Sequence, residues 1–368
     1  MRTFLKKLVE TESPSHDKSA VDRVGRIVAD ECRRLGAQVE IIPNHETGDL
    51  VLARFLPARE TQPPLKPVLI LGHMDTVFPL GTLQTFPYRE EDGRIHGPGT
   101  LDMKSGIVIA LQAISAVVSN GGNFSRPITA LFNSDEEIGS HTSRAQIESL
   151  ARESEVVFVL EGALMDGSLK TWRKGGGSFQ VKTHGRAAHA GGDHQAGRNA
   201  IEEMAHQVLA IQKLTNYEKQ TTLNVGVIHG GTVSNVVPDE ASIEVDVRVM
   251  QPGEWERIEA EMQKLKPVLD GTSLEITGEY NRPPMPFGEV SQAAFQKASQ
   301  IAKDELGLEL KAGGTGGASD GNFVAPLGIP VLDGMGAIGE GYHSDREYIF
   351  ASSLEERARL LEVLLSNW

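Results

Sequence analysis

Cysteine is nearly absent from this 368-residue sequence, since Cys32 is the only one. A single thiol can form neither a disulfide framework nor a thiolate zinc cluster. Any bound metal must therefore be held by His, Asp and Glu. The lack of disulfides also fits a reducing compartment.

Basic clusters and long apolar runs are missing as well. The formal net charge is −14, which, without a basic patch, argues against nucleic acid or an anionic membrane as a partner. The N-terminal segment turns polar after nine residues and lacks the apolar core of a signal peptide. No later stretch approaches the roughly 20 apolar residues that a membrane span needs. We therefore expect a cytoplasmic protein with no membrane partner.

Helix-like and strand-like segments alternate in the first part of the chain. Residues 17–36 carry apolar side chains at helical spacing and close on Gly36, and residues 104–119 are typical of a buried helix. Short apolar runs at 68–71, within 127–137 and within 155–163 predict strands. This alternation predicts an α/β fold with a mostly parallel sheet flanked by helices. Active sites in such sheets gather at the carboxyl ends of the strands.

The middle of the chain shows the order β-α-β-β-α-β, which is ferredoxin-like. Its segments are strands at 177–185, 221–231, 241–250 and 273–280, and helices at 197–214 and 254–269. The flanking stretches "RKGGG" and "NRPP" indicate domain boundaries. We expect a discontinuous catalytic domain at 1–174 and 283–368, and an inserted domain at 175–282.

Two histidines and several carboxylates follow the strand-like runs or lie in glycine-rich loops. They are His73, Asp102, Glu136, Glu137, Glu161 and His343. Without cysteine, this ligand set suits zinc, with cobalt or manganese as possible substitutes. Two metals about 3.5–4 Å apart need a bridging carboxylate, one histidine apiece and one further carboxylate each. The inventory meets that requirement and predicts a two-metal site.

The adjacent pair Glu136 and Glu137 suggests two roles. Neighbouring side chains generally point apart, so one can hold a metal while the other faces water as a base. Each candidate also has an ordinary structural interpretation: a solvated turn for the glutamates, a strand end for His73, a helix N-cap for Asp102 and a loop for His343. Their joint occurrence in one ligand chemistry favours the metal site.

The glycine-rich segment "GGTGGASDGN" at 313–322 requires a separate interpretation. It lacks the Lys-Ser/Thr ending of a P-loop and the spacing of a dinucleotide-binding fingerprint. We expect it to provide backbone donors for a carboxylate or an oxyanion.

Six motifs, in chain order, connect the sequence to a known family. They are "GHMDTVFP", "GPGTLDMKSG", "SDEEIGS", "HGRAAHAGG", "SNVVPDEASIEVDVR" and "GYHSDREY". The chain resembles the zinc-dependent exopeptidases: glutamate carboxypeptidases of the carboxypeptidase G type, acetylornithine and succinyl-diaminopimelate deacylases, aminoacylases and carnosinases. The similarity spans nearly the whole chain. It implies a zinc-peptidase catalytic domain, an inserted ferredoxin-like dimerisation and lid domain, and a homodimer.

The resemblance implies a set of metal ligands. His73 and Glu161 would hold one zinc ion, Glu137 and His343 would hold the other, and Asp102 would bridge them. All five positions match motif residues of the family.

The resemblance also implies roles in catalysis and substrate binding. Glu136 would be the general base, and Asp75 would orient the first zinc-binding histidine. Arg248 and Asn235 would bind the free carboxylate of the substrate, since Arg pairs with a carboxylate through two parallel hydrogen bonds. A solvated strand face is the alternative for Arg248. His189 would polarise the scissile carbonyl, commonly across a dimer interface.

These observations predict a dizinc carboxypeptidase that releases a C-terminal amino acid, with glutamate as a candidate, from a peptide or N-acyl conjugate. A deacylase such as acetylornithine deacetylase is the nearest alternative because it shares the metal site. A non-catalytic binding protein is a third alternative, which the complete ligand set disfavours. The "RKGGG" segment departs from the family pattern and leaves the roles of Arg173 and Lys174 open.

Overall fold

The computed structural model describes residues 1–58, 61–119 and 124–368, and the chain forms two compact units. The larger unit comprises Met1–Trp172, Phe287–Thr315 and Ser319–Trp368. The second unit comprises Arg173–Pro286 and Gly316–Ala318, so the range 175–282 expected for the inserted domain falls inside it. The use of this unit in dimerisation stays a prediction.

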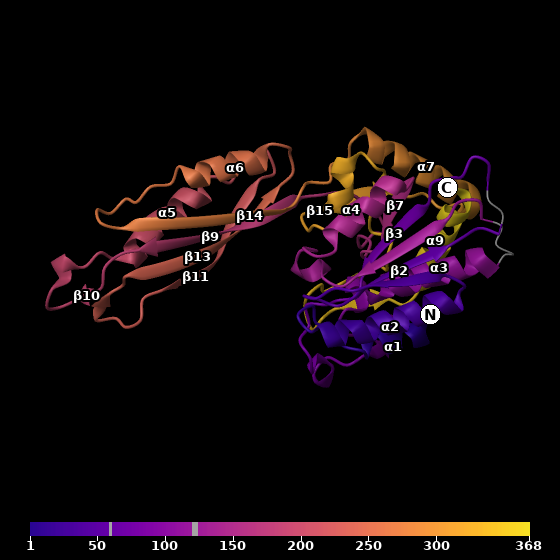
Figure 1. Cartoon of the computed structure of the whole chain (residues 1–368), viewed down its shortest axis with the longest axis horizontal. Helices are drawn as coiled ribbons and strands as arrows, with labels where there is room; N and C mark the ends of the chain where they lie inside the picture. Colours follow the sequence, from indigo (N-terminus) through magenta and orange to yellow (C-terminus); the bar gives the residue numbers. More distant parts are fainter. Residues whose placement is uncertain (59–60, 120–123) are drawn as a thin grey trace. The chain divides into compact units, whose positions relative to one another are not determined.

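A six-stranded sheet forms the centre of the larger unit (Figure 1). Strand β2 runs antiparallel to both of its neighbours, β1 and β6, and the other neighbouring pairs are parallel, so the predicted mostly parallel sheet is confirmed. Strands β3 and β6 are buried along their whole length, which explains why their sequences are continuous apolar runs. In sheet order the strands are β1 (Gln38–Ile42), β2 (Leu50–Phe55), β6 (Ile128–Asn133), β3 (Val68–His73), β7 (Val156–Val159) and β16 (Val331–Leu332).

Helices flank this sheet (Figure 1). The second helix begins where the Asp17 carboxylate accepts a hydrogen bond from the Ala20 N–H, and it ends before Gly36, whose φ of +91° suits glycine. The helices are α1 (Arg2–Val9), α2 (Lys18–Arg34), α3 (Ser105–Ser119), α4 (Arg144–Glu153), α7 (Glu289–Leu306), α8 (Gly321–Val324) and α9 (Ser353–Asn367).

Helix α3 is the buried helix that the sequence predicted. Together with the preceding turn it forms a segment, Thr100–Ser119, that is apolar and long enough to cross a membrane, contrary to our expectation that no stretch would be. Its apolar window is 78% buried inside the protein, as in the central helix of a packed core. Its composition is therefore explained by burial.

Two short strands bring distant loops together in the larger unit. Strand β18 (Tyr348–Phe350) pairs with β5 (Arg94–His96), between β17 (Gly339–Glu340) and β4 (Arg89–Glu91). The loop after β5 carries Asp102, and the loop before β18 carries His343. This pairing places the two candidate ligands near each other. A separate ribbon joins β8 (Leu169–Arg173) to β15 (Ala312–Thr315).

The second unit has the predicted β-α-β-β-α-β order. Its sheet order is β11-β13-β9-β14, with a core of buried side chains shared by both helices on one face. On β13 the residues alternate between that core and an uncovered polar face. The elements are β9 (Gly175–His184), α5 (Ala200–Gln212), β11 (Thr222–Gly230), β13 (Glu240–Val249), α6 (Glu254–Gln263) and β14 (Ser273–Arg282), with a small pair of β10 (Ala188–His189) and β12 (Val236–Val237).

Helix α6 ends at Gln263, six residues earlier than the predicted range of 254–269. The N–H groups of Val268 and Leu269 donate to the Glu203 carboxylate instead of continuing the helix. Pro267 also disfavours helical backbone at the residue before it. The local hydrogen bonds therefore override the helical periodicity.

Candidate metal centre

Asp102 lies at the centre of the candidate site, in the turn Thr100–Lys104 that leads into α3. Its Oδ1 is 3.1 Å from His73 Nε2, and its Oδ2 is 3.1 Å from His343 Nε2. The carboxylate is buried, with 7% of the residue exposed. Its two oxygens therefore face two different imidazoles, which is the arrangement that a bridging ligand requires.

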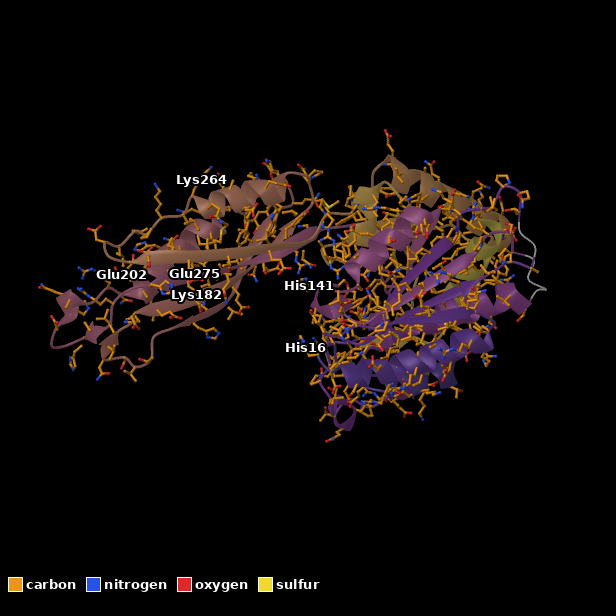
Figure 2. The ribbon with its side chains drawn as sticks, in the orientation of Figure 1. His16, His141, Lys182, Glu202, Lys264 and Glu275 are labelled. Atoms are coloured by element: carbon orange, nitrogen blue, oxygen red, sulfur yellow. The ribbon has the colours of Figure 1, made fainter. Side chains whose placement is uncertain are left out.

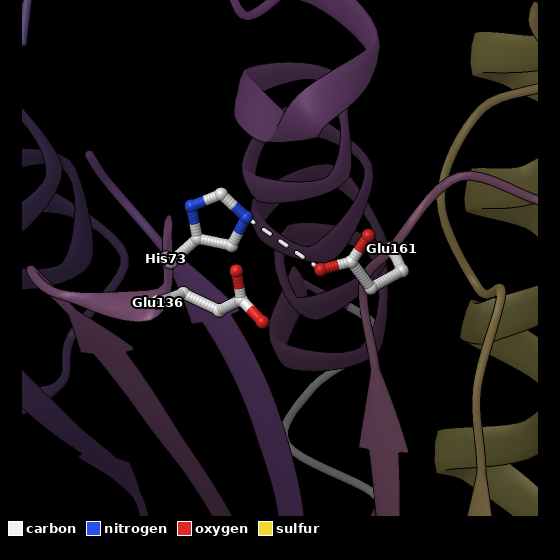
Figure 3. A group of neighbouring side chains, drawn as sticks. All are labelled: His73, Glu136 and Glu161. Carbon is white, nitrogen blue, oxygen red and sulfur yellow. Dashed lines mark ion pairs between the residues drawn. The ribbon is translucent and has the colours of Figure 1, made fainter. Parts of the chain in front are cut away.

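The first half of the site gathers around His73, at the end of β3. Its Nε2 is 3.5 Å from Oε1 of Glu161, which follows β7, and Glu136 extends toward the same point (Figure 3). Potential ligand atoms of these three residues all lie within 4.8 Å of one another. His73 Nδ1 lies 3.0 Å from the carbonyl oxygen of Asp75, which can only accept, so the neutral ring presents its lone pair at Nε2.

The second half of the site pairs His343 with Glu137. Glu137 Oε2 is 3.2 Å from His343 Nε2. Its other oxygen, Oε1, is buried and has no hydrogen-bond partner among the described residues. Potential ligand atoms of His73, Asp102 and Glu137 again lie within 4.8 Å of one another. Imidazole nitrogens with carboxylate oxygens, one of them unsatisfied, fit a divalent metal such as zinc.

The electrostatics of the cluster also fit bound cations. Burial, together with the charge of Asp102, raises the pKa of Glu137 to about 7. Hydrogen bonds to Asp102 and Glu137 raise the pKa of His343 to about 10. Burial alone would lower the pKa of His73, but hydrogen bonds to carboxylates, with Asp102 the foremost, raise it well above its usual value. Metal binding must therefore release protons from these imidazoles.

Asp75 connects the parts of the site. It is fully buried, and its Oδ1 is 3.4 Å from His73 Nδ1. Its carboxylate also accepts hydrogen bonds from Ser15 Oγ at 2.7 Å and from the backbone N–H groups of Glu136 and Glu137 at 3.3 and 3.2 Å. One carboxylate thus positions an imidazole and the turn that carries both glutamates.

Glu347 is a functional candidate that our sequence reasoning missed. It is fully buried, and its carboxylate accepts hydrogen bonds from the N–H groups of Gly99, Leu101 and Asp102 at 3.1, 2.5 and 3.0 Å. Burial raises its pKa to about 8. It holds the turn that carries Asp102. Its place four residues after His343 in "GYHSDREY" was the only available signal.

Residues of the "SDEEIGS" and "RKGGG" segments also make structural hydrogen bonds. Asp135, which follows β6, accepts hydrogen bonds from Thr142 and Ser143 and thereby fixes the turn before α4. Arg173 is buried and donates to the carbonyl oxygens of Gly317 and Ala318 in the glycine-rich segment. The donor role expected for that segment stays a prediction.

In the second unit, His189 lies beside Asn235. His189 pairs with Val236 in the β10–β12 ribbon, and the Ala190 N–H donates to the carbonyl oxygen of Asn235. The His189 ring is exposed, and its Nδ1 accepts hydrogen bonds from two glycine N–H groups at 3.1 and 2.9 Å. Because Nδ1 is an acceptor, the neutral ring carries its proton on Nε2, where it can be donated.

Unlike His189, which lies in the separate β10–β12 pair, Arg248 lies in the four-stranded sheet of the second unit. It is on the uncovered face of β13, eight positions after Glu240, which at about 3.3 Å per residue is ~26 Å along the strand. Its guanidinium donates to both carboxylate oxygens of Asp246, with Nη2 2.8 Å from Oδ2. Within one chain, Arg248 and His189 are therefore not brought together.

Known proteins resemble the chain over nearly its whole length. Carboxypeptidase G2 from Pseudomonas sp. (strain RS-16) is 31% identical over 99% of this chain and 88% of its own. Succinyl-diaminopimelate desuccinylase from Acinetobacter baumannii (strain AYE) is 26% identical over 93% of this chain and 92% of its own. The crystal structure of the M20 family metallo-carboxypeptidase Sso-CP2 from Sulfolobus solfataricus has a TM-score of 0.80 at 17% identity, covering 99% of this chain and 98% of that one.

A family model matches the part of the chain that contains the candidate centre. The model of peptidase family M20/M25/M40 matches residues 69–367. All candidate metal ligands, from His73 to His343, lie within that range. The chain therefore belongs to peptidase family M20/M25/M40 and is a hydrolase.

Proposed function

We propose that the protein is a dizinc carboxypeptidase that hydrolyses the amide bond before a C-terminal amino acid with a free carboxylate. The observation that carries the proposal is the position of Asp102, whose two oxygens each face a histidine paired with a glutamate. His73 and Glu161 would hold one ion, and Glu137 and His343 the other. The similarity to carboxypeptidase G2 supports the carboxypeptidase assignment.

Bound zinc would polarise the scissile carbonyl and make the attacking water more acidic. The protein groups supply the remaining steps. Glu136 takes the proton of the water and passes it to the leaving amine. The Glu136 N–H is held by Asp75, which fixes the turn on which this base stands. His189 Nε2–H donates to the carbonyl oxygen as negative charge develops there.

Arg248 is the proposed binder of the substrate carboxylate. In the present structure Asp246 occupies the Arg248 guanidinium, with Nε donating to Oδ1 and Nη2 donating to Oδ2. A substrate carboxylate has the same geometry and can replace that contact through two parallel hydrogen bonds. The side chain of Arg248 is 38% exposed, so a ligand can reach it.

His189 and Asn235 are proposed to act on the substrate of the partner subunit in a homodimer. The separation of ~26 Å along β13 between the strand ends nearest to His189 and Arg248 supports this arrangement, because one small substrate cannot contact both ends of the sheet. The cytoplasmic location also stays a proposal.

An N-acyl amino acid deacylase is the second candidate, and the similarity to a desuccinylase favours it. The two functions share the metal centre and differ in the groups that flank the scissile bond. A non-catalytic binding protein is disfavoured because the ligand set is complete.

The proposal is tested by a hydrolysis screen with zinc, cobalt or manganese supplied. Substrates are folyl-glutamate, dipeptides and N-acetyl amino acids, each as the free acid and as the C-terminal amide. We expect free acids to be strongly preferred. Arg248→Ala should lower kcat/KM for the free acids, and the decrease should correspond to a loss of about 2–5 kcal/mol of transition-state stabilisation. An unchanged preference in the variant would rule out Arg248 as the carboxylate binder.

A further inference from the structure

A buried carboxylate of the glycine-rich segment contacts the turn that carries the two adjacent glutamates. This glutamate turn, residues 134–143, connects β6 to α4. Ser140 Oγ donates to Asp320 Oδ1 at 2.5 Å, and Asn133 Nδ2 donates to Asp320 Oδ2. The three residues Ser140, Asn133 and Asp320 are 0%, 1% and 3% exposed. Asp320 therefore binds the chain both before the turn and after its glutamates.

The backbone of the glutamate turn needs support at Ser140. Gly139 and Ser140 have φ values of +101° and +54°. Glycine adopts such values readily, whereas serine rarely does, so a serine persists there only where its surroundings hold it. The Ser140 N–H donates to the Asp135 carbonyl at 2.7 Å, and its hydroxyl donates to Asp320. The contact with Asp320 thus helps to fix the backbone that follows the two glutamates.

The orientation of Asn133 shows how strongly the Asp320 carboxylate acts as an acceptor. A side-chain amide has an oxygen that accepts and a nitrogen that donates. Asn133 turns its nitrogen toward Asp320, and its buried oxygen then finds no hydrogen-bond partner in the described part of the chain. An unsatisfied buried oxygen is costly, so the charge-assisted bond to Asp320 outweighs that cost.

Asp320 itself is firmly placed at the start of α8. Its carbonyl oxygen accepts a hydrogen bond from the Phe323 N–H at 3.1 Å. The preceding residue, Ser319, donates through Oγ to Asp333 at 2.5 Å and through its N–H to Asn322 Oδ1 at 2.9 Å. Ser319, Asp333 and Asn322 are fully buried. A carboxylate on such a fixed segment can position the groups that it binds.

The two ends of the glutamate turn are held by different carboxylates. His141, next to Ser140, is exposed, and Figure 2 shows it at the surface of the larger unit. The turn must therefore be held by groups inside the protein. Asp75 accepts hydrogen bonds from the N–H groups of both glutamates and holds the beginning of the turn. Asp320 holds its end.

We propose that Asp320 is a positioning residue for catalysis: through Ser140 it holds the turn that places the carboxylate of the general base, Glu136. This inference rests on the proposed function, because a general base is needed only if the protein hydrolyses an amide. It gives a role to the aspartate of the glycine-rich segment, for which only backbone donors were expected. Because Glu137 stands on the same turn, zinc is supplied in excess in every test.

The first test removes the hydroxyl that binds Asp320. Ser140→Ala should lower kcat by about 10–100-fold with little change in KM, because the base is displaced while the substrate binders are not. Ser154→Ala is the matched control, since Ser154 is 2% exposed and donates to the Leu150 carbonyl at 2.7 Å, at the far end of α4. This control should keep the kcat of the parent. An unchanged kcat in the Ser140 variant, or a change confined to KM, would contradict the proposal.

The second test asks whether Asp320 acts through Ser140. Asp320→Asn replaces one acceptor oxygen with a donor and should lower kcat at least as much as Ser140→Ala does. The double variant should lower kcat no further than Asp320→Asn alone, because both changes break the same contact. Asp333→Asn, at a buried aspartate that binds Ser319 instead, is the control and should keep the kcat of the parent. Effects that multiply in the double variant would show that Asp320 does not act through Ser140.

A third measurement does not depend on turnover. Hydrogen exchange of the backbone amides of residues 134–143 is followed by mass spectrometry in zinc-loaded protein. Ser140→Ala and Asp320→Asn should each speed exchange in this turn, because local opening becomes easier, whereas Asp333→Asn should not. Unchanged exchange would overturn the positioning proposal even if the parent hydrolyses amides. A parent that cleaves no amide would overturn the proposed function, while the exchange rates would still decide whether Asp320 holds the turn.

Discussion

The two units hold their candidate functional residues in contrasting ways. In the larger unit, His73 is 1% exposed and Asp102 is 7% exposed, and each contacts several buried groups. In the second unit, His189 is exposed and Arg248 is half-buried. His73 and Asp102 are therefore fixed in place, whereas His343, with 53% of its side chain exposed, resembles the groups suited to substrate binding in remaining accessible.

The supporting carboxylates show the same contrast. Asp75 and Glu347 are buried and accept several hydrogen bonds each, so they fix their partners. Asp246 is a surface partner of Arg248, with 46% of its side chain exposed. An exposed pair contributes little to stability and can exchange partners at low cost. Substitutions should therefore abolish function in the first region and weaken it by degrees in the second.

The largest effect is expected for Asp102→Ala. Removing the carboxylate that faces both histidines should release both metals and reduce hydrolysis to background. Metal content by elemental analysis, together with turnover, checks this result. Asp270→Ala, at an exposed position of the second unit, should retain metal and activity. Two zinc ions retained in the Asp102 variant would show that it does not bridge.

Glu136→Gln should separate catalysis from metal binding within the rigid region. We expect both metals to remain and turnover to fall by about 10²–10⁴-fold, because the general base is lost. Glu137→Gln, one residue further, should instead weaken metal binding. If the Glu136 variant instead lost zinc and its remaining protein hydrolysed substrate at the normal rate, Glu136 would be a metal ligand and Glu137 would be the candidate base.

His189→Ala should lower turnover by about 100-fold, with little change in metal content, because it removes a donor to the carbonyl oxygen. The decisive measurement mixes this variant with Glu136→Gln under conditions that allow subunits to exchange. If His189 acts across the dimer, one site of each mixed dimer regains both groups and activity returns. Mixed dimers without activity would place His189 in the site of its own chain or outside catalysis.

The smallest effect on function is expected for Glu254→Gln, which tests whether the second unit also contains a rigidly held charge. Glu254 is 4% exposed and accepts hydrogen bonds from Arg257, Lys219 and Thr221. The Arg257 hydrogen bond is the main cause that lowers its pKa to about 2, against the opposing effect of burial.

Because the folded-state pKa of Glu254 lies below the usual 4.5, its stabilisation is present above that pH and is lost as the pH falls toward about 2. The variant should lose about 1–3 kcal/mol of unfolding free energy at pH 7, and the difference from the parent should shrink at pH 2–3. Thermal unfolding at both pH values measures this change. A difference that is independent of pH would assign the effect to packing instead.

Local sequence signals were sufficient to predict much of the fold and the cluster of candidate ligands. His73 follows a continuous apolar run, and Asp102 precedes an apolar helix, so their places at the sheet edge follow from periodicity and strand ends. The alternation on β13 likewise predicted that Arg248 lies on the polar face. These inferences depend on neighbours in sequence, which the chain displays directly.

The supporting groups could not be predicted in this way. Glu347 accepts hydrogen bonds from residues 245–248 positions earlier, and Ser15 contacts a carboxylate 60 positions later. Neither residue differs in sequence from an ordinary loop residue. The pairing of Arg248 with Asp246 also depends on side-chain rotamers that the strand pattern leaves open. Contacts between distant segments become visible only when the fold is known.

The contacts of Arg173 have a consequence for how the chain can be divided. Its buried guanidinium binds the carbonyl oxygens of Gly317 and Ala318, which belong to the second unit although Phe287–Thr315 of the larger unit separates them from the rest of it. The second unit is therefore not one continuous segment. A fragment of residues 173–286 would keep the Arg173 guanidinium but lose the carbonyl oxygens of Gly317 and Ala318, which accept its hydrogen bonds. A buried cation without acceptors is destabilising. The shortest fragment that folds by itself must therefore also include a copy of the glycine-rich turn.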